Sequence, residues 1–232
     1  MKTIGIIGAM REEIAPILSA LKCEFNTIES GNNTYYTIEY NGYNLIIAYS
    51  KIGKVHSTIT CTTMILRFNV DCIIFTGVAG SLSSDIKVGD LVLATSLCQY
   101  DVDITSFGHP LGFIPDSAIY FDTSCVLNDL ARCVAKTNNL DLKEGIIASG
   151  DTFISDTQKK QWIVNNFNAI AVEMEGASIA VSASAFNIPF CVIRSISDDA
   201  SGDACISFDD FLLESASRSA SFVLSMIDIF PR

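Results

Sequence analysis

The sequence predicts an α/β fold, because apolar runs of strand length alternate with segments of helical period. Residues 170–172 form a short apolar run, a helical segment of small residues follows, and residues 190–193 form a second apolar run. Pro189 marks the end of the helix between them, since proline disfavours helical geometry at the preceding residue. The chain also opens with a strand-like segment, Thr3–Gly8, that runs directly into a helical pattern.

The strand–helix–strand unit over residues 170–199 is βαβ-like and brings ionisable groups to its strand ends. Glu173 and Glu175 follow the first strand, and Arg194 and Asp198 follow the second. Carboxylates also collect at strand ends because loops are solvated, but charges are seldom placed against a core without partners. Ligands of open α/β sheets bind outside the carboxyl ends of strands, so we predict the functional site here.

The first half of the chain contains a hairpin and two further helices. Strands over residues 34–40 and 43–50 flank Asn41-Gly42, the strongest short signal for a hairpin. Glu12 and Glu13 fall in the first turn of the first helix, where the helix dipole favours carboxylates. Residues at helical spacing mark one face of each helix: apolar Ile14, Ile17, Leu18 and Leu21 in the first, and Val55, Ile59, Thr62 and Leu66 in the second.

A glycine-rich segment, residues 76–81, follows a buried strand over residues 72–75. Such a strand exit can cradle a phosphate, but glycine serves equally well in any tight strand–helix turn. The segment lacks the lysine of a P-loop and the downstream context of a dinucleotide fingerprint. We therefore predict neither of those two nucleotide sites.

The second half continues the alternation of strands and helices. A strand is predicted over residues 88–94, and residues 101–118 form a long loop without periodicity. Leu127, Leu130, Ala131 and Val134 define one helical face. The last helix is expected to start at residues 207–210, which resemble a capping box, and to run almost to Pro231. No linker or repeat interrupts the pattern, so residues 1–232 are predicted to form one domain.

Charge and cysteine content exclude several classes of protein. The net charge of −11 argues against nucleic acid and against anionic lipid as partners. No apolar run reaches the roughly 20 residues of a membrane span. The apolar segment at residues 1–8 is too short for a signal peptide and is interrupted by glycine. The eight cysteines form no C-x-x-C pair and only two histidines exist, so we expect no zinc site. Reduced, buried thiols in a cytoplasmic protein account for them better.

A series of motifs occurs in order along nearly the whole chain: GIIGAM (5–10) with Glu12-Glu13, KIGK (51–54), TGVAG (76–80), SGDTFI (149–154), AVEME (171–175), RSISD (194–198) and SFDDF (207–211). Together these motifs resemble those of the 5′-methylthioadenosine/S-adenosylhomocysteine nucleosidases. The resemblance implies a three-layer α/β/α sandwich around a central twisted mixed β-sheet, of nucleoside phosphorylase type. It also implies a homodimer that works on a small adenine nucleoside without metal or other cofactor.

The implied reaction is hydrolysis of the N-glycosidic bond of 5′-thio-substituted adenosines, which releases adenine and the thioribose. By motif, Glu13 would be the base that activates water, Asp198 the acid that assists adenine departure at N7, and Glu175 the ligand of the ribose hydroxyls. Phe153 would stack on adenine, and the Ile154 backbone would read its edge. The other implied substrate-binding residues are Met10, Ile52, Val78, Gly80, Glu173, Met174, Arg194, Ser197 and Phe208, with Arg194 and Ser197 orienting Glu175 and Asp198.

The two catalytic roles need opposite protonation states. A base at Glu13 must be ionised, which is the default near pH 7 for a group with a reference pKa of about 4.3. An acid at Asp198 must be protonated, which needs a shift of about 3 pH units, or roughly 4 kcal/mol. Burial against the preceding strand or repulsion from Asp199 can supply part of that shift. Alternatively, Asp198 acquires its proton when substrate binds.

The resemblance also gives the loop over residues 101–118 a role. In the family, a Phe and a Pro from the neighbouring subunit complete the apolar wall around the 5′ substituent, and they match Phe107 and Pro115 here. Burying one methylene contributes about 0.8 kcal/mol, so an alkylthio group needs such a wall. We therefore predict a homodimer whose sites are each capped by the partner.

Two departures from the family and two rival functions remain. Val78 stands where many relatives have Ser, and Arg11 replaces a common acidic residue; neither is the proposed acid or base. The first rival is a purine nucleoside phosphorylase, but Arg11 is the only cation in the first-strand exit that is a candidate phosphate ligand. The second rival is a non-catalytic nucleoside-binding or storage protein. Methylthioadenosine, S-adenosylhomocysteine, 5′-deoxyadenosine and futalosine-type substrates all stay open.

Overall fold

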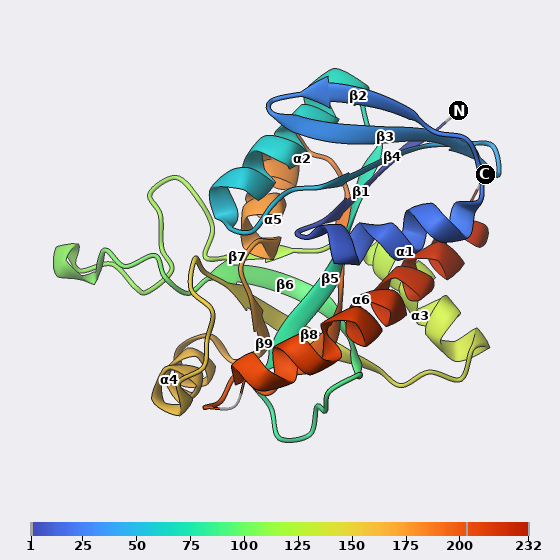
Figure 1. Cartoon of the computed structure of the whole chain (residues 1–232). Coiled ribbons are helices and arrows are strands. Elements are labelled where there is room, and N and C mark those ends of the chain that lie inside the picture. The colour runs from blue at the N-terminus through green and yellow to red at the C-terminus, as the bar shows by residue number, and fades with distance from the viewer. Residues whose placement is uncertain (1, 203, 232) are drawn as a thin grey trace.

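A central mixed β-sheet with helices on both faces forms the body of the protein in the computed structural model, which describes residues 2–202 and 204–231 (Figure 1). The strands are β1 (Thr3–Gly8), β2 (Asn26–Ser30), β3 (Asn33–Tyr40), β4 (Tyr43–Tyr49), β5 (Cys72–Ser81), β6 (Leu91–Gln99), β7 (Tyr120–Asp122), β8 (Leu142–Ser149), β9 (Ala169–Glu173) and β10 (Phe190–Asp198). The helices are α1 (Arg11–Leu21), α2 (Lys54–Phe68), α3 (Cys125–Thr137), α4 (Thr157–Phe167), α5 (Gly176–Ala185) and α6 (Ala204–Asp228), with a 3₁₀ turn η1 (Thr105–Phe107).

The sheet closes on itself at one end. Its strand order is β10-β6-β8-β9-β5-β1-β4-β3-β2, and β10 pairs a second time, with β5. Strands β5, β10, β6, β8 and β9 therefore form a closed ring, from which β1, β4, β3 and β2 extend as an open, twisted sheet. Strands β1, β4, β5 and β10 run in parallel, whereas β9 and β6 join β5 and β10 in antiparallel fashion.

Side-chain alternation along the strands separates the core into layers. Ile4 and Ile6 of β1 belong to one apolar cluster with residues of α1, α3 and α6, whereas Ile7, Ile73 and Phe75 belong to a second cluster with residues of α2 and α5. This period of two is the expected consequence of a pleated strand that is covered on both faces. Figure 1 shows α1 and α6 side by side on one face and α2 and α5 on the other. The predicted three-layer α/β/α fold with a mixed sheet is confirmed.

The βαβ-like interpretation of residues 170–199 is wrong in one respect. Strands β9 and β10 are not parallel neighbours, because β5 lies between them, antiparallel to β9 and parallel to β10. Because β9 is antiparallel to β5 and β10 is parallel to it, the two strands run in opposite directions. Their carboxyl ends nevertheless meet across β5, since Val172 and Asp198 both pair with Gly80, and the Glu173 side chain reaches Arg194.

Some element boundaries also differ from the predicted ones. The glycine-rich segment is no turn, because β5 continues through it to Ser81 with every residue buried. Strand β6 starts at Leu91 and extends to Gln99. Helix α6 already includes Ala204, so residues 207–210 lie inside the helix and do not form its cap. The backbone amide of Ala204 instead donates to the Ser201 carbonyl at 2.9 Å, which starts the helix earlier.

Helix α2 presents the apolar face that the sequence marks to solvent. Val55, Ile59 and Leu66 are 68%, 43% and 61% exposed. The buried face carries Ser57, Thr60, Cys61, Met64 and Ile65. Small polar residues can occupy that face because α5 approaches closely and supplies a partner, the Ser178 hydroxyl, 2.6 Å from the Ser57 hydroxyl.

The cysteines are all free, but only half of them are buried. Cys61, Cys72, Cys98 and Cys191 lie in the core, whereas Cys23, Cys125, Cys133 and Cys205 are exposed. The expectation of buried thiols is therefore wrong for the second group, which lies at helix surfaces and in a loop. Within residues 2–202 and 204–231, every helix is too short or too polar to cross a membrane.

Candidate active site

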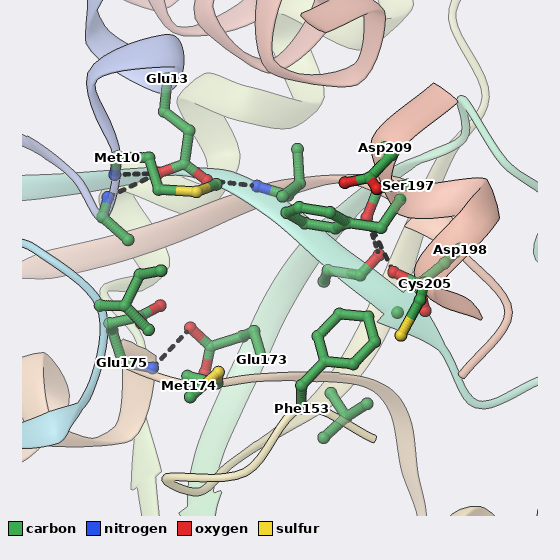
Figure 2. A pocket seen from close by; sticks show the side chains of 17 residues that line it. Met10, Glu13, Phe153, Glu173, Met174, Glu175, Ser197, Asp198, Cys205 and Asp209 are labelled. Carbon is green, nitrogen blue, oxygen red and sulfur yellow. Dashed lines mark hydrogen bonds between the residues drawn. The ribbon is translucent and has the colours of Figure 1, made fainter. Parts of the chain in front are cut away.

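A cavity of about 550 Å³ opens where the closed ring of strands meets the first turns of α1, α5 and α6 (Figure 2). It is lined by Ala9, Met10, Glu13, Ile52, Val78, Ala79, Gly80, Phe153, Val172, Glu173, Met174, Glu175, Ser197, Asp198, Cys205, Phe208 and Asp209. Apolar side chains form most of the wall, and the carboxylates converge on it from several elements. Such a concave, largely apolar pocket with a few convergent polar groups is typical of a small-molecule site.

Most residues that the sequence analysis singled out come together in this cavity. They are Met10, Glu13, Ile52, Val78, Gly80, Phe153, Glu173, Met174, Glu175, Ser197, Asp198 and Phe208. Ile154 lies next to the cavity, in a smaller void behind Phe153. Arg194 is fully buried beneath the cavity floor, and Phe107 and Pro115 lie on the loop that projects from the body of the protein (Figure 1).

The cavity also includes residues that the sequence analysis missed. Ala9, Ala79 and Val172 belong to motifs already noted, and they line the wall beside named neighbours. Cys205 and Asp209 come from the first turns of α6. Phe208 and Asp209 follow Cys205 by three and four residues, which places all three on one side of the helix, but that signal is visible only when the helix is known to include residue 204.

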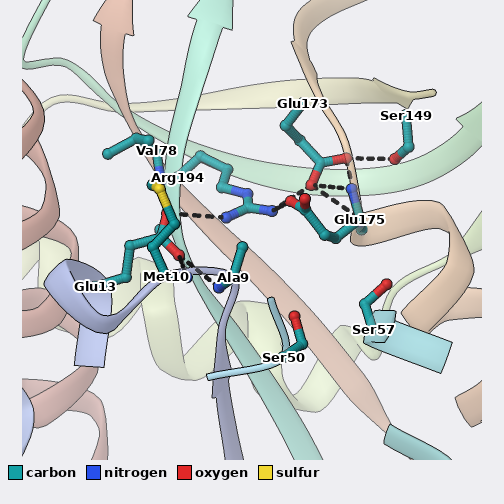
Figure 3. Close-up of polar contacts among 12 residues, drawn as sticks. Ala9, Met10, Glu13, Ser50, Ser57, Val78, Ser149, Glu173, Glu175 and Arg194 are labelled. Carbon is teal, nitrogen blue, oxygen red and sulfur yellow. Dashed lines mark hydrogen bonds and ion pairs between the residues drawn. The ribbon is translucent and has the colours of Figure 1, made fainter. Parts of the chain in front are cut away.

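The buried guanidinium of Arg194 faces three carboxylates (Figure 3). Its Nη2 forms an ion pair with Glu173 and lies 3.6 Å from Glu175, and its Nη1 lies 3.9 Å from Glu13. The guanidinium carbon also lies 3.9 Å from the centroid of the Phe75 ring. Buried charges of this kind need paired partners, and removal of one partner costs about 3–5 kcal/mol.

Glu13 is buried in the first turn of α1, where backbone amides surround its carboxylate. Oε2 accepts hydrogen bonds from the amides of Ala9 at 2.5 Å and Met10 at 3.0 Å, and Oε1 accepts one from Val78 at 2.9 Å. Burial raises the pKa of Glu13, whereas Arg194 and these amides oppose the rise. The carboxylate therefore both caps its own helix and reaches the cavity, and the amides and Arg194 partly offset the cost of burying its charge.

Asp198 ends β10 on the other side of the cavity. It is 2% exposed; Oδ2 accepts a hydrogen bond from the Ser197 hydroxyl at 2.9 Å, and Oδ1 accepts one from the Ala200 amide at 2.9 Å. Burial raises the pKa of Asp198 and Asp199 adds to the rise, while the two hydrogen-bond donors oppose it. The direction is the one that a proton donor needs, and burial is the main cause, as the sequence analysis proposed.

Glu175 occupies the junction between β9 and α5. Its Oε1 accepts a hydrogen bond at 2.8 Å from the amide of Gly53, at the N-terminus of α2. Burial and the nearby charge of Glu173 raise the pKa of Glu175 to about 8, although Arg194 lowers it. Helix α2, β9 and β10 thus all contribute to the position of this one carboxylate.

Aromatic rings close the end of the cavity near Asp198. Phe153 packs edge to face on Phe208, with ring centroids 5.6 Å apart and an interplanar angle of 80°. Phe153 is 39% exposed, so part of its ring is free to contact a ligand. Phe107, by contrast, is 82% exposed in η1 on the projecting loop and does not line this chain's own cavity.

Fold and cavity together define an α/β enzyme of nucleoside phosphorylase-like architecture with an acidic, apolar-walled nucleoside site. The model of the phosphorylase superfamily matches residues 3–228, and the chain belongs to that superfamily. It is 53% identical to the aminodeoxyfutalosine nucleosidase of Helicobacter pylori strain J99, over 98% of this chain and 99% of the relative. It is 40% identical to the 5′-methylthioadenosine/S-adenosylhomocysteine nucleosidase of Staphylococcus haemolyticus, over 97% of this chain and 99% of that one.

Solved structures give the same grouping. The futalosine hydrolase of H. pylori strain 26695 superposes with a TM-score of 0.97 at 53% identity, covering 98% of this chain and 97% of the other. A methylthioadenosine/adenosylhomocysteine nucleosidase of H. pylori, in complex with a pyrrolidine-based ligand, also gives 0.97 at 53% identity, with 98% of both chains covered. The protein is therefore an enzyme, a nucleosidase that cleaves an N-glycosidic bond.

The closeness of Gly77 to the charged cluster gives a first prediction. A Cβ at residue 77 would lie 2.2 Å from Arg194 Nη1 and 2.3 Å from Glu13 Oε1, and the residue has φ +153°. We expect Gly77→Ala to lower nucleosidase activity by roughly a hundredfold, since a displacement of about 1 Å can cost that much. The matched control is Gly202→Ala, where a Cβ meets nothing within 4 Å. Equal activities of the two variants would contradict this account.

Proposed function

We propose that the protein hydrolyses the N-glycosidic bond of adenine nucleosides whose 5′ hydroxyl is replaced, by hydrogen or by a larger substituent. In this reaction the bond between ribose C1′ and adenine N9 breaks, and a water oxygen forms the new bond to C1′. Substrates proposed for the site are 5′-methylthioadenosine, S-adenosylhomocysteine, 5′-deoxyadenosine and aminodeoxyfutalosine. The proposal goes beyond the general nucleosidase activity in naming the leaving group, the 5′ group and the residues that act.

The charge of the cavity wall is the observation that carries this proposal. Glu13, Glu173, Glu175, Asp198 and Asp209 line the cavity, and no lysine or arginine is among the lining residues of the described chain. A wall of carboxylates stabilises a ribosyl centre that becomes cationic as the base departs. The same wall repels inorganic phosphate, so it favours water as the nucleophile over the phosphate that a phosphorylase uses.

Arg11, the one candidate phosphate ligand suggested by the sequence, supports the same preference. Its guanidinium stacks on the Tyr49 ring at 5.2 Å, and its Nε donates a hydrogen bond to the Tyr49 hydroxyl at 3.2 Å. Arg194 lies next to carboxylates of the cavity wall, and its positive charge is shared among Glu13, Glu173 and Glu175. Neither guanidinium belongs to the cavity wall.

The proposed roles fit the two sides of the cavity. Glu13 and Asp198 lie on opposite sides of it, with Glu175 near the Glu13 side (Figure 2). Glu13, whose charged form accepts hydrogen bonds from the amides of Ala9, Met10 and Val78, takes a proton from the attacking water. Asp198, whose pKa is raised, gives its proton to adenine N7 as the bond to N9 breaks. Glu175 accepts a hydrogen bond from a ribose hydroxyl.

The proposed binding residues divide between the two ends of the nucleoside. Phe153 stacks on the adenine, the Ile154 backbone reads its edge, and Ser197 holds Asp198 in place through a hydrogen bond of 2.9 Å. The remaining wall residues, Met10, Ile52, Val78, Gly80, Met174 and Phe208, contact the ribose and the 5′ group. Val78 brings no hydroxyl to this wall, so its contribution is its backbone amide, which holds Glu13.

The choice of 5′ substituents rests on the relatives. Relatives that are 53% identical to this chain include an aminodeoxyfutalosine nucleosidase and a solved methylthioadenosine/adenosylhomocysteine nucleosidase. An aminodeoxyfutalosine nucleosidase of Campylobacter jejuni is 50% identical. A wide, apolar cavity of about 550 Å³ accommodates an adenosine and leaves room for a substituent, so we assign both substrate types to this site.

We further propose a cytoplasmic homodimer in which residues 1–232 form one domain and each cavity is completed by the partner's Phe107 and Pro115. Phe107 is 82% exposed on a loop that leads away from its own cavity. Val55, Ile59 and Leu66 leave an exposed apolar face on α2, and burial of this face in a dimer would remove it from water. All eight cysteines are free, which suits a reducing compartment.

The reaction itself is tested by product analysis. With each of the four proposed substrates, we expect adenine release at rates that do not change when inorganic phosphate is added, because the wall carries no free cation for it. Chromatography with mass detection identifies the sugar product. A ribose 1-phosphate product would reject hydrolysis, and the ratio of kcat/KM values among the four nucleosides ranks the 5′ groups.

The proposed acid gives a prediction about pH. The protonated form of Asp198 is the active one, so the wild-type rate falls as pH rises through its raised pKa. Asp198→Asn should lose at least about a hundredfold in kcat on adenine nucleosides and should lack this limb of the pH profile. Nitrophenyl ribosides, whose leaving group needs no proton, should be hydrolysed with a much smaller loss. An equal loss on both substrate types would remove Asp198 from the role of acid.

The shared site is tested by mixing two defective proteins. Phe107→Ala should weaken binding of alkylthio substrates, and Glu13→Gln should bind them without turnover, because an amide takes no proton from water. In a heterodimer of the two, one site has both defects and the other has neither. The re-associated mixture should therefore exceed the summed activity of the parents. No gain, with heterodimers shown by native mass spectrometry, would place Phe107 at its own subunit's site.

A further inference from the structure

Glu173 lines the cavity, but its carboxylate is already fully engaged with the protein (Figure 3). Oε1 accepts hydrogen bonds from the Ser149 hydroxyl and from the Gly176 amide at 2.9 Å. Oε2 accepts from the amides of Gly176 at 2.8 Å and Glu175 at 3.1 Å and pairs with Arg194. With its oxygens occupied in this way and 7% of its surface exposed, the side chain has little capacity left for a substrate hydroxyl.

Ser149 extends this arrangement from outside the cavity. It is fully buried at the end of β8, is not a lining residue, and joins Glu173 to α5: its hydroxyl donates to Glu173 and accepts from the Ala177 amide at 2.7 Å. The amides of residues 175, 176 and 177 are therefore all satisfied by Glu173 and Ser149. A helix normally leaves its first amides without partners, so these two side chains together cap α5.

Packing around Gly176 leaves this turn little freedom to move. A Cβ at residue 176 would lie 2.5 Å from Leu97 Cδ2 and 3.2 Å from Glu173 Oε1. Glu175, which precedes it, is the N-cap residue of α5. The direction in which the Glu175 carboxylate points thus depends on the hydrogen bonds that hold the backbone of residues 175–177.

We propose that Glu173 and Ser149 are positioning residues, which together with Arg194 lock the β9–α5 turn and so fix Glu175 against the ribose, and that Glu173 is not itself a substrate ligand. The inference rests on the proposed role of Glu175 as the partner of a ribose hydroxyl. It corrects the expectation from the family resemblance that Glu173 binds substrate. It also adds Ser149, to which the sequence analysis gave no role.

The same contacts set the charge on Glu175. The groups that face it are Glu173 from β9, Glu13 from α1, Arg194 from β10 and the Gly53 amide at the start of α2. The negative charge of Glu173 disfavours ionisation of Glu175, and it also draws Arg194 to itself. With Gln at residue 173, both effects weaken, so Glu175 should ionise at lower pH, by about 1–3 pH units.

The experiment compares Glu173→Gln and Ser149→Ala with the wild type on adenosine and 2′-deoxyadenosine derivatives of the same 5′ substituent. If Glu173 and Ser149 position Glu175, both variants should lose roughly tenfold to a hundredfold in kcat/KM on the riboside. Their kcat/KM on the deoxyriboside should fall much less, because only the riboside has the hydroxyl that Glu175 binds. The matched control is Ser182→Ala, a buried serine of α5 whose hydroxyl donates only to the Ser178 carbonyl at 2.8 Å. It should keep the wild-type ratio of riboside to deoxyriboside.

A pH profile and a double mutant complete the test. In the pH profile of riboside kcat/KM, the limb that disappears in Glu175→Gln is the one that Glu175 causes. In Glu173→Gln that same limb should move to lower pH. Because Glu173 and Ser149 act on one turn, the double variant should lose less than the product of the single losses. Thermal unfolding of each variant identifies any that fails to fold. If one of the two single variants does not fold, the riboside-to-deoxyriboside ratio and the pH profile of the other one test the proposal.

Several outcomes overturn the inference. If Ser149→Ala keeps the wild-type riboside preference while Glu173→Gln loses it, Glu173 is a direct ligand and not a positioning residue. If neither variant changes the preference or moves the pH limb, the turn does not control Glu175. A wild-type protein that releases no adenine from any nucleoside would instead reject the proposed function, so the two failures are distinguishable.

Discussion

The pairing of Arg194 with three buried carboxylates is the interaction on which the rest of the site depends. Glu13, Glu173 and Glu175 come from α1, β9 and the start of α5, and each lies within 4 Å of the same guanidinium. Without that cation, each carboxylate would carry the full cost of burial. Even with that cation nearby, burial and the negative charge of Glu173 raise the pKa of Glu175 to about 8, and Arg194 offsets only part of the rise.

The closed ring of strands makes this cluster possible. A flat sheet would place the end of β9 far from the middle of β10, but pairing of β5 with both of them brings Glu173 onto Arg194. Glycine at residue 77 leaves the space through which the Arg194 and Glu13 side chains approach each other. The glycine-rich segment of β5 thus admits charged side chains into the core, whereas the sequence alone left open a phosphate cradle or a tight turn after the strand.

Burial acts in the same direction on the two proposed proton-transfer groups, and their hydrogen bonds make them different. Glu13 receives three backbone amides and the field of Arg194, all of which favour its ionised form. Asp198 receives one amide and one hydroxyl, and it lies beside the negative charge of Asp199. Burial is thus the largest effect on both pKa values and raises both, and the opposing contacts are more numerous around Glu13 than around Asp198.

The sequence by itself determined the alternation of strands and helices, the layered fold and most residues of the cavity wall, because apolar periodicity and the motifs are local properties of the chain. It did not determine which face of α2 is buried, how far β5 continues, or that β9 and β10 run in opposite directions. Those features depend on which distant segments pack together. Only the tertiary structure showed that the Glu173 carboxylate is bound by Ser149 and Arg194, because hydrogen-bond partners 24 and 21 residues away leave no pattern in the local sequence.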